Sequence, residues 1–354
     1  MHARRSVLSA IIFGVLVGIL LSLLTGIGIV FLDITSRVRY VGRDDSAQAF
    51  AWPPNLLETL DASPEDRALR DQANSDFEML QQLIGQGTVS RAERNDDPTN
   101  ATPSRGQETP GLTPIAGTEN FMLFGVDARD NSYRGRADVT MLISVNHPRR
   151  TVNFVSLMRG MYVNIGIRHH EWGMLNAAYS YGGPALAVRT VERNFGIPIK
   201  GFVAVNFNSF RRIVDAAGGV DIVLTDAEAR YLGMTPGAHH MNGQEALNYA
   251  RIRKIDSDFQ RNGRQRKVIF SLLASLSRNP TALYNAATVA LANTYTDLDL
   301  NRYVSQAPTY LSYSHRELQL PHMSETKRFF QGGREMWWVD LVKTHRRLIT
   351  FLQG

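Results

Sequence analysis

The sequence predicts an α/β protein, sandwich-like (α-β-α), in which helices cover a central mixed sheet, with one N-terminal transmembrane helix before it. Three observations lead to this prediction. An uncharged apolar run stands near the N-terminus, strand-like segments alternate with helical ones after residue 119, and charge is segregated along the chain.

The apolar run over residues 6–32 predicts a membrane anchor. It carries no charge and is longer than the roughly 20 apolar residues that cross a bilayer as a helix. Arg4 and Arg5 precede it and Asp33 follows it, so the positive-inside rule places residues 1–5 in the cytoplasm. A cleaved signal peptide has an apolar region of only about 7–15 residues. We therefore expect a single-pass signal-anchor in the cell membrane and an extracytoplasmic remainder.

Residues 33–118 are expected to form an extracytoplasmic stalk and a flexible linker. The last part of this segment, from residue 87 on, is crowded with Thr, Ser, Gly, Pro, Asn and Asp. Too few of its residues are apolar to offset the entropy lost on ordering. The organised domain is expected at 119–354, and its motifs are concentrated in 119–275.

The charge of the chain is unevenly distributed. The net charge is +6 over 354 residues, but the stalk and linker carry −6 and the domain from residue 119 carries +10, mostly as arginine. Arginine presents a planar fork that binds phosphate with two hydrogen bonds. A basic extracytoplasmic domain points to phosphorylated ligands or membrane lipid rather than nucleic acid. The chain has no cysteine, which excludes disulfides, cysteine-bound zinc and thiol nucleophiles.

The domain is expected to begin with three strands, because β-branched and aromatic residues fill segments 121–126, 139–146 and 151–158. A turn at 147–150 would join the last two. Beyond them, periodicity and capping residues predict helix 184–195, strand 200–206, a helix capped by Asn206 or Asn208 that stops at Gly218-Gly219, strand 219–225, a helix from Asn242 to Arg251, and a long helix over 258–277. The C-terminal third adds further helical stretches and the apolar segment 336–341.

Two aspartates stand at the ends of the predicted strands. Asp127 follows the first strand and Asp138 opens the second. If these strands are antiparallel neighbours, both carboxylates lie at the same edge of the sheet. Carboxylates without nearby His or Cys suit a hard cation such as Mg²⁺, which also takes phosphate oxygens. The alternative is an aspartate in a turn and another that caps a strand.

Arginines are densest over residues 246–267. Arg251 and Arg253 close one predicted helix, and Asp258 is expected to cap the next one. Offsets of three and four place further polar side chains on one face of that helix: Arg261, Arg264 and Gln265. Arginines that converge near a helix N-terminus can bind phosphate or pyrophosphate. The alternative is a solvated, salt-bridged helix face.

In these motifs the sequence resembles the LytR-CpsA-Psr family of membrane-anchored cell-wall glycopolymer transferases. The matching motifs occur in the family order: GVDAR (125–129), GRADVT (135–140), a strand ending in Arg159, LNAAYSYGG (175–183), DAAGGVDI (215–222), NGQEALNYARIRK (242–254) and DSDFQRNGRQ (256–265).

The resemblance implies a phosphotransferase that moves a glycan from a polyprenyl-pyrophosphate carrier to peptidoglycan or a related wall polysaccharide. It implies that Asp127 and Asp138 hold Mg²⁺ or Mn²⁺. Arg159, Arg253 and Arg261 take the catalytic roles. The pyrophosphate is expected to contact these three residues together with Arg251, Arg264 and Gln265. Possible supporting residues are Arg129, Arg136, Asp256 and Asp258.

One position departs from the family pattern. The family commonly has Ser-Ile-Pro-Arg-Asp where this chain has Arg159 followed by Gly160. The missing aspartate leaves two alternatives open: a non-catalytic protein that binds lipid intermediates or attenuates wall regulation, and a pyrophosphatase that uses water as the acceptor. Asp256 and Asp258 are candidates to replace the missing carboxylate.

Overall fold

The computed structural model describes residues 109–354, apart from 129–132, 134, 168–169, 254, 299 and 332–333. The predicted anchor and most of the predicted stalk and linker lie outside these residues. Within the described part of the chain, no helix is both long and apolar enough to cross a membrane. The described residues form two compact units.

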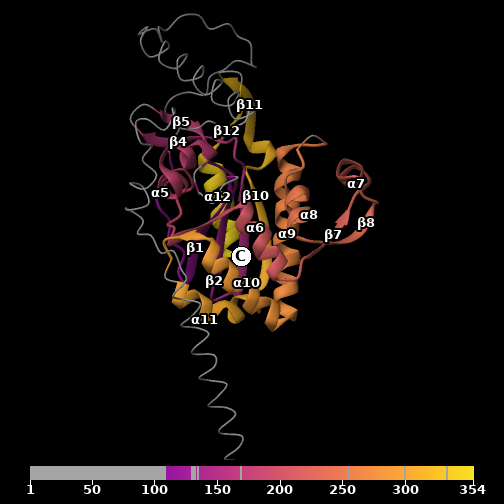
Figure 1. The fold of residues 1–354 in the computed structure, drawn as a ribbon. Helices are drawn as coiled ribbons and strands as arrows, with labels where there is room; N and C mark the ends of the chain where they lie inside the picture. Colours follow the sequence, from indigo (N-terminus) through magenta and orange to yellow (C-terminus); the bar gives the residue numbers. More distant parts are fainter. Residues whose placement is uncertain are drawn as a thin grey trace, which may run out of the picture. The chain divides into compact units, whose positions relative to one another are not determined.

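The first unit, here called the sheet unit, comprises residues 109–127, 134–200 and 315–354. Its main strands lie side by side in the order β10-β3-β2-β1, with β1 antiparallel to β2 and β2 antiparallel to β3 (Figure 1). Their bounds are β1 Thr118–Asp127, β2 Arg136–Asn146, β3 Thr151–Leu157 and β10 Ser314–Leu320. The first three confirm the predicted strands.

The rest of the sheet unit consists of two hairpins and two helices, with a short 3-10 turn at Met323–Glu325. The elements are hairpin β4 (Tyr162–Ile167) and β5 (His170–Met174), hairpin β11 (Thr326–Gln331) and β12 (Arg334–Val339), helix α5 (Leu175–Phe195) and helix α12 (Leu341–Gln353). Helix α5 packs against β2 and β4, and α12 packs against α5 and β2. Helices on a sheet confirm the α/β class.

Burial explains why the first strands formed as predicted. Every residue of β3 is buried, which accounts for its continuous apolar run. The turn at 147–150 is present, and its Arg150 amide donates to the His147 carbonyl at 3.2 Å. Helix α5 begins nine residues before the predicted start because it is two segments, broken at Gly182 and Gly183 where the backbone is not helical.

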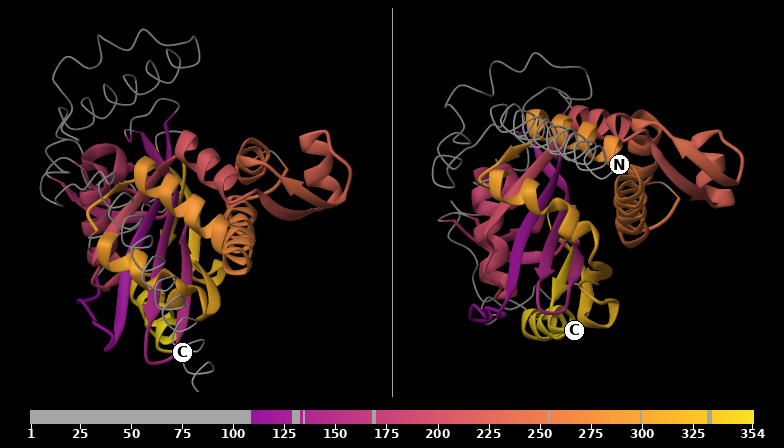
Figure 2. Two further views of the ribbon diagram at one scale, coloured as in Figure 1. Left: turned by 60° about the horizontal axis from the view of Figure 1, so that its bottom comes forward. Right: turned by 90° about the horizontal axis from the view of Figure 1, so that it is seen from below.

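The second unit, here called the helical unit, comprises residues 128–133 and 201–314. Its strands form two antiparallel pairs, β6 (Gly201–Asn206) with β9 (Tyr295–Thr296), and β7 (Val220–Leu224) with β8 (Gly237–Met241). Its helices are α6 (Phe207–Ala216), α7 (Asp226–Leu232), α8 (Gly243–Ala250), α9 (Asp258–Arg278), α10 (Pro280–Asn293) and α11 (Leu300–Leu311). The β7-α7-β8 segment projects beside α8 and α9 (Figures 1 and 2).

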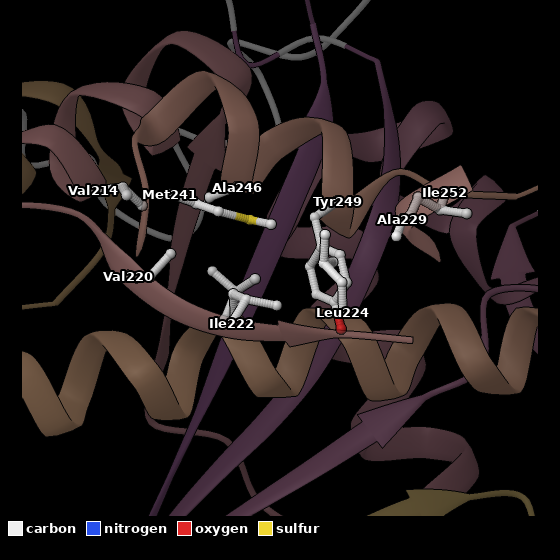
Figure 3. Close-up of a cluster of buried hydrophobic side chains, with 10 residues drawn as sticks. Val214, Val220, Ile222, Leu224, Ala229, Met241, Ala246, Tyr249 and Ile252 are labelled. Atoms are coloured by element: carbon white, nitrogen blue, oxygen red, sulfur yellow. The ribbon is translucent and has the colours of Figure 1, made fainter. Parts of the chain in front are cut away.

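A cluster of buried apolar side chains joins these elements (Figure 3). Buried and exposed residues alternate along β7, so one face of the strand enters the cluster. From α8 and the residues after it come Tyr249 and Ile252, and from α9 comes Val268, each no more than 1% exposed. The cluster therefore fixes the end of α8 against the body of α9.

The helix caps test the sequence predictions directly. Asn206 caps α6 and Asn242 caps α8, as expected, and each side chain accepts a backbone N–H of its helix. The predicted long helix is confirmed as α9, with Asp258 in its first turn, but the capping role predicted for Asp258 was wrong, because the N-cap residue is Ser257. The Asp258 carboxylate instead pairs with Arg261 at 3.0 Å. The two residues are three positions apart, so they are neighbours on the helix surface.

Candidate active site

Three predicted site residues lie at one edge of the sheet unit, and we call them the strand-edge group: Asp127, Asp138 and Arg159. Asp127 ends β1, and Arg136 at the start of β2 is its partner in the register. Arg159 follows the end of β3, which is antiparallel to β2. The antiparallel pairing therefore brings these three positions to the same edge. The sequence predicted this for Asp127 and Asp138, and the structure adds Arg159.

A β-bulge sets the position of Asp138. Gly125 pairs with Val139 and Val126 pairs with Ala137, so Asp138 is an extra residue on β2. Glycine is required at Gly125, because a Cβ there would lie 2.8 Å from the Val139 side chain.

Glycine is also required at Gly135, at the start of β2. Its φ is +149° and a Cβ would lie 2.6 Å from the Asp127 carbonyl oxygen. The glycines of the two motifs thus allow the end of β1 and the start of β2 to approach closely, and so bring their aspartates toward each other.

The Arg159 guanidinium donates to Asp138 Oδ1 at 3.0 Å, with side chains 24% and 14% exposed. The start of α5 supports this edge, because the Asn176 amide donates to the Arg159 carbonyl at 3.2 Å and the Ser180 hydroxyl donates to the Gly135 carbonyl at 3.2 Å. The ion pair is therefore held at both of its strands by one helix segment.

The donor set of the strand-edge group fits a magnesium-type cation. A cation at this edge would have the carboxylates of Asp127 and Asp138 as its protein ligands; among the described residues, no group of three or more His, Cys, Asp or Glu side chains could hold a metal. Mg²⁺ is commonly held by one or two carboxylates, with water and substrate phosphate oxygens at its other positions. Two carboxylates at a sheet edge match this usual coordination of Mg²⁺.

In the helical unit, two predicted arginines are exposed at the end of α8. Arg251 is the C-cap residue, and its guanidinium lies over the Phe207 ring with 4.3 Å between the guanidinium carbon and the ring centroid. Arg253 follows two residues later and is also exposed. Contact with an aromatic face orients a guanidinium while leaving its N–H groups available to an anion.

The polar face of α9 is buried. Arg261, Arg264 and Gln265 are 2%, 2% and 9% exposed, which confirms that they share a face but places that face inside the unit. Arg261 pairs with Asp258, whose side chain is 30% exposed.

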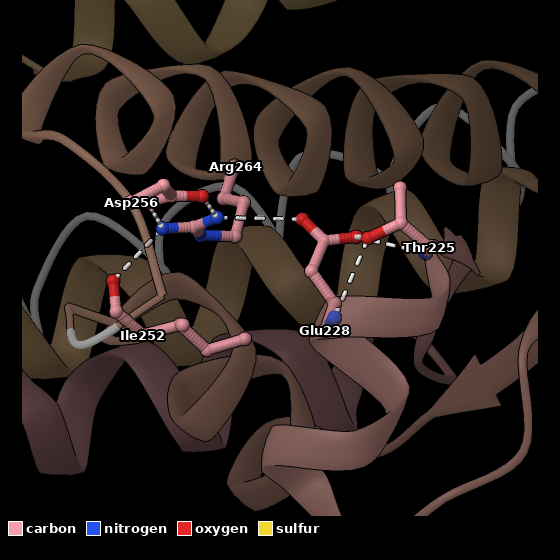
Figure 4. Close-up of polar contacts among 5 residues, drawn as sticks. All are labelled: Thr225, Glu228, Ile252, Asp256 and Arg264. Carbon is pink, nitrogen blue, oxygen red and sulfur yellow. Dashed lines mark hydrogen bonds and ion pairs between the residues drawn. The ribbon is translucent and has the colours of Figure 1, made fainter.

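Arg264 has the densest set of contacts (Figure 4). Its two terminal nitrogens donate to both carboxylate oxygens of Asp256 at 2.6 and 2.7 Å. They also donate to Glu228 Oε1 at 3.4 Å and to the Ile252 carbonyl at 3.0 Å. The other oxygen of Glu228 accepts from the amide and hydroxyl of Thr225, both at 3.0 Å.

The pKa shifts in this network follow its geometry. Burial alone would lower the pKa of Arg264, but the hydrogen bonds and charges of Asp256 and Glu228 outweigh burial and raise it. Burial raises the pKa of the Tyr249 hydroxyl, and the neighbouring Glu228 carboxylate adds to this. Arg264 is thus permanently charged and Tyr249 neutral near pH 7.

The structure thus places the predicted residues in two groups, one in each unit. Arg129 lies outside the described residues. Asp256 and Asp258, the candidates to replace a carboxylate at position 160, are engaged by Arg264 and Arg261. Sequence reasoning missed Glu228, although the Thr225-to-Glu228 spacing is that of a capping box, which the structure contains.

The space beside Gly160 is filled by β12. The Trp337 amide donates to the Gly160 carbonyl at 2.9 Å, and a Cβ on Gly160 would lie 3.3 Å from Trp337 Cδ1. Nothing in the sequence relates these two positions, which are far apart along the chain.

Fold and site together define an α/β protein with carboxylates at strand ends and clustered arginines, a class suited to phosphate-containing ligands. Comparison with known proteins gives the family. A profile of the LytR_cpsA_psr family matches residues 85–345, and the chain belongs to that family.

Two curated relatives are teichoic acid transferases by name. The chain is 35% identical over 201 residues to the polyisoprenyl-teichoic acid–peptidoglycan teichoic acid transferase TagU of Enterococcus faecalis, covering 54% of this chain and 66% of the relative. It is 39% identical over 158 residues to TagU of Bacillus subtilis, covering 44% and 51%. The chain thus matches between about half and two thirds of the length of these relatives.

A solved structure described as TagT bound to LI-WTA shares the fold. The TM-score is 0.58 at 26% identity, over 71% of this chain and 98% of that one.

Proposed function

We propose that this chain transfers a glycopolymer from a polyprenyl-pyrophosphate carrier to peptidoglycan or a related wall polysaccharide, at the outer side of the membrane that its N-terminus spans. The strand-edge group carries the proposal, because it places two carboxylates and a guanidinium at one sheet edge. Membership of the family and the names of the curated relatives support the same donor and acceptor classes.

The chain's own residues divide the work. Asp127 and Asp138 hold Mg²⁺ or Mn²⁺, which when bound supplies positive charge to the pyrophosphate oxygens. In the sheet unit, Arg159, oriented by Asp138 at 3.0 Å, binds those oxygens and stabilises the charge that builds up during transfer. In the helical unit, the exposed Arg251 and Arg253 are the arginines that bind pyrophosphate.

The reaction is a phosphoryl transfer. A hydroxyl of the acceptor sugar attacks the phosphorus next to the glycopolymer, a new oxygen–phosphorus bond forms, and the bridging oxygen–phosphorus bond breaks. Polyprenyl phosphate leaves and takes up the hydroxyl proton. Catalysis of this class comes mainly from positioning and electrostatic stabilisation, which is what arginines beside carboxylates provide.

The test uses the full chain in detergent, with a labelled polyprenyl-pyrophosphate glycan and purified peptidoglycan. Arg253→Ala is expected to lower the transfer rate by ~10²–10³-fold, as does loss of one charge-stabilising donor. Arg230→Ala removes an equally exposed arginine in the last turn of α7 and serves as the matched control. Full transfer by Arg253→Ala would remove the assignment of that residue.

The same assay separates the two alternatives. A pyrophosphatase would release free phosphorylated glycan whether or not peptidoglycan is present. A non-catalytic binding protein would retain the labelled donor without turnover on any wall acceptor.

A further inference from the structure

The two terminal nitrogens of the Arg264 guanidinium are fully engaged by protein oxygens. Its side chain is 3% exposed, and each of its two terminal nitrogens has two acceptors, from Asp256, Glu228 and Ile252. Its four terminal N–H groups therefore all point at protein oxygens.

We infer that Arg264 is a positioning residue, which holds the segment 251–257 so that Arg251 and Arg253 are presented to the pyrophosphate, and that it does not bind the pyrophosphate itself. This inference rests on the proposed function. The Arg264 guanidinium donates hydrogen bonds to the segment at two points, the Ile252 carbonyl and the Asp256 carboxylate. Arg253 lies between these two residues in the sequence. Arg251 immediately precedes the first of these points.

The far side of the network is fixed as well. Glu228 is 5% exposed and accepts from the Thr225 amide and hydroxyl, so α7 holds the carboxylate that faces Arg264. The Ile252 side chain is fully buried in the apolar cluster. The segment is thus tied to α7 and α9 by charge and to the core by an apolar anchor.

Charge counting favours positioning over direct binding. One guanidinium faces two carboxylates, so this network already carries an excess of negative charge. A pyrophosphate that took over the terminal nitrogens of Arg264 would separate them from Glu228, which is 5% exposed and would keep only its contacts with Thr225; weakening the pairing of a buried charge is costly. Arg251 and Arg253, by contrast, are exposed at the end of α8.

Asp256→Asn decides between the two roles. If Arg264 bound the pyrophosphate, Asp256 would compete with it, and removing the carboxylate charge would strengthen binding. If Arg264 positions the segment, the same change loosens the segment and weakens binding. The Asp256 side chain is 26% exposed, so this variant should fold even where Arg264→Met does not.

The probe is geranylgeranyl pyrophosphate, titrated calorimetrically into the full chain in detergent with Mg²⁺, while hydrogen exchange is followed over 251–257. We expect both Asp256→Asn and Arg264→Met to weaken binding by about 10- to 100-fold, the range found when residues that orient metal ligands are lost. Exchange over the segment should rise in both. The double variant should lose little more than either single one, since both break the same contact.

Two controls exclude a merely structural effect. Lys267→Met removes an exposed charge from the same helix and should change neither readout. Arg264→Lys keeps the charge but not the two-pronged geometry, so it should recover melting temperature without recovering affinity.

Unchanged or tighter binding by Asp256→Asn, or affinity that simply follows melting temperature across the variants, overturns the inference. If the unmodified chain neither binds the probe nor transfers glycan, the proposed function fails instead. Hydrogen exchange still tests in that case whether Arg264 and Asp256 hold the segment 251–257 in place. Unchanged exchange over this segment in Asp256→Asn overturns the inference.

Discussion

Restoring the family aspartate at position 160 should harm this protein rather than improve it. Gly160 is buried and its φ is not positive, so backbone strain does not require glycine there. The lack of space for a larger side chain favours glycine. A Cβ would lie 3.3 Å from Trp337 Cδ1, 3.8 Å from Met174 Cε and 3.9 Å from the Glu335 carbonyl oxygen. The carboxylate of Gly160→Asp would extend further into this packed region.

Two costs add. Overpacking a well-filled region costs about 1–3 kcal/mol, and a buried polar group without a partner costs about 1–3 kcal/mol, more if charged. The three nearest atoms are two carbons and one acceptor oxygen, so none of them can donate to the new carboxylate. A total near 3 kcal/mol corresponds to a fall in melting temperature of roughly 6–12 °C for a folded domain of about 150–250 residues.

Thermal unfolding of the full chain in detergent measures the first effect, and the labelled-donor assay measures transfer. Gly160→Ala adds only the Cβ and should cost less than about 1 kcal/mol, because Trp337 need shift by only a few tenths of an ångström. In a Trp337→Ala background the aspartate should cost at least about 1 kcal/mol less than in the natural chain, since the two positions share one space. A Gly160→Asp protein that melts as high as the natural chain and transfers faster would refute this reasoning.

Two further predictions concern the helical unit. Asn242→Ala should lower the unfolding free energy by about 1 kcal/mol, because it removes the side-chain oxygen that accepts from the backbone amides of Gln244 and Glu245 at the start of α8; an unchanged urea midpoint would contradict this. The pKa of His240 should lie above the ordinary 6.5, because Asp221 and the Gly218 carbonyl accept from its two ring nitrogens, each at 2.7 Å. A raised pKa means that the stability it contributes is present below about pH 6.5 and is lost as pH rises through the folded-state value. The side chain is 64% exposed, so solvent screens this contribution and keeps it small. An NMR titration checks the shift, which Asp221→Asn should largely abolish.

Local patterns predicted the local structure. The strand β7 and the asparagine caps of α6 and α8 depend on residues within one strand or one turn, and the structure contains the strand and both caps, with Asn206 rather than Asn208 at α6. The shared edge of Asp127 and Asp138 followed from one assumption, antiparallel pairing, which the register confirms. The N-cap of α9 was missed because serine and aspartate both favour that position and they are adjacent here, as Ser257 and Asp258.

Contacts between distant segments were beyond the sequence. Arg264 contacts Glu228, 36 residues earlier, and Gly160 is covered by Trp337 from a hairpin near the C-terminus. Neither contact can be deduced from the spacing of residues in the sequence, because the register and packing of separate elements determine both contacts. The bulge at Asp138 is of the same kind, since it is defined by the mismatch of two strands.

The arginine run shows how such contacts change the functional interpretation. Helical spacing correctly placed Arg261 and Arg264 on one face, but spacing does not tell whether a face looks into solvent or into the protein. Here that face is buried, and its guanidiniums contact Asp258, Asp256 and Glu228. The terminal nitrogens of Arg264 are all taken by protein acceptors, so this buried charge stabilises the fold. The positive charge that this unit can offer to an anion is therefore smaller than its arginine count suggests, whereas Arg251 and Arg253 are exposed where the chain leaves α8.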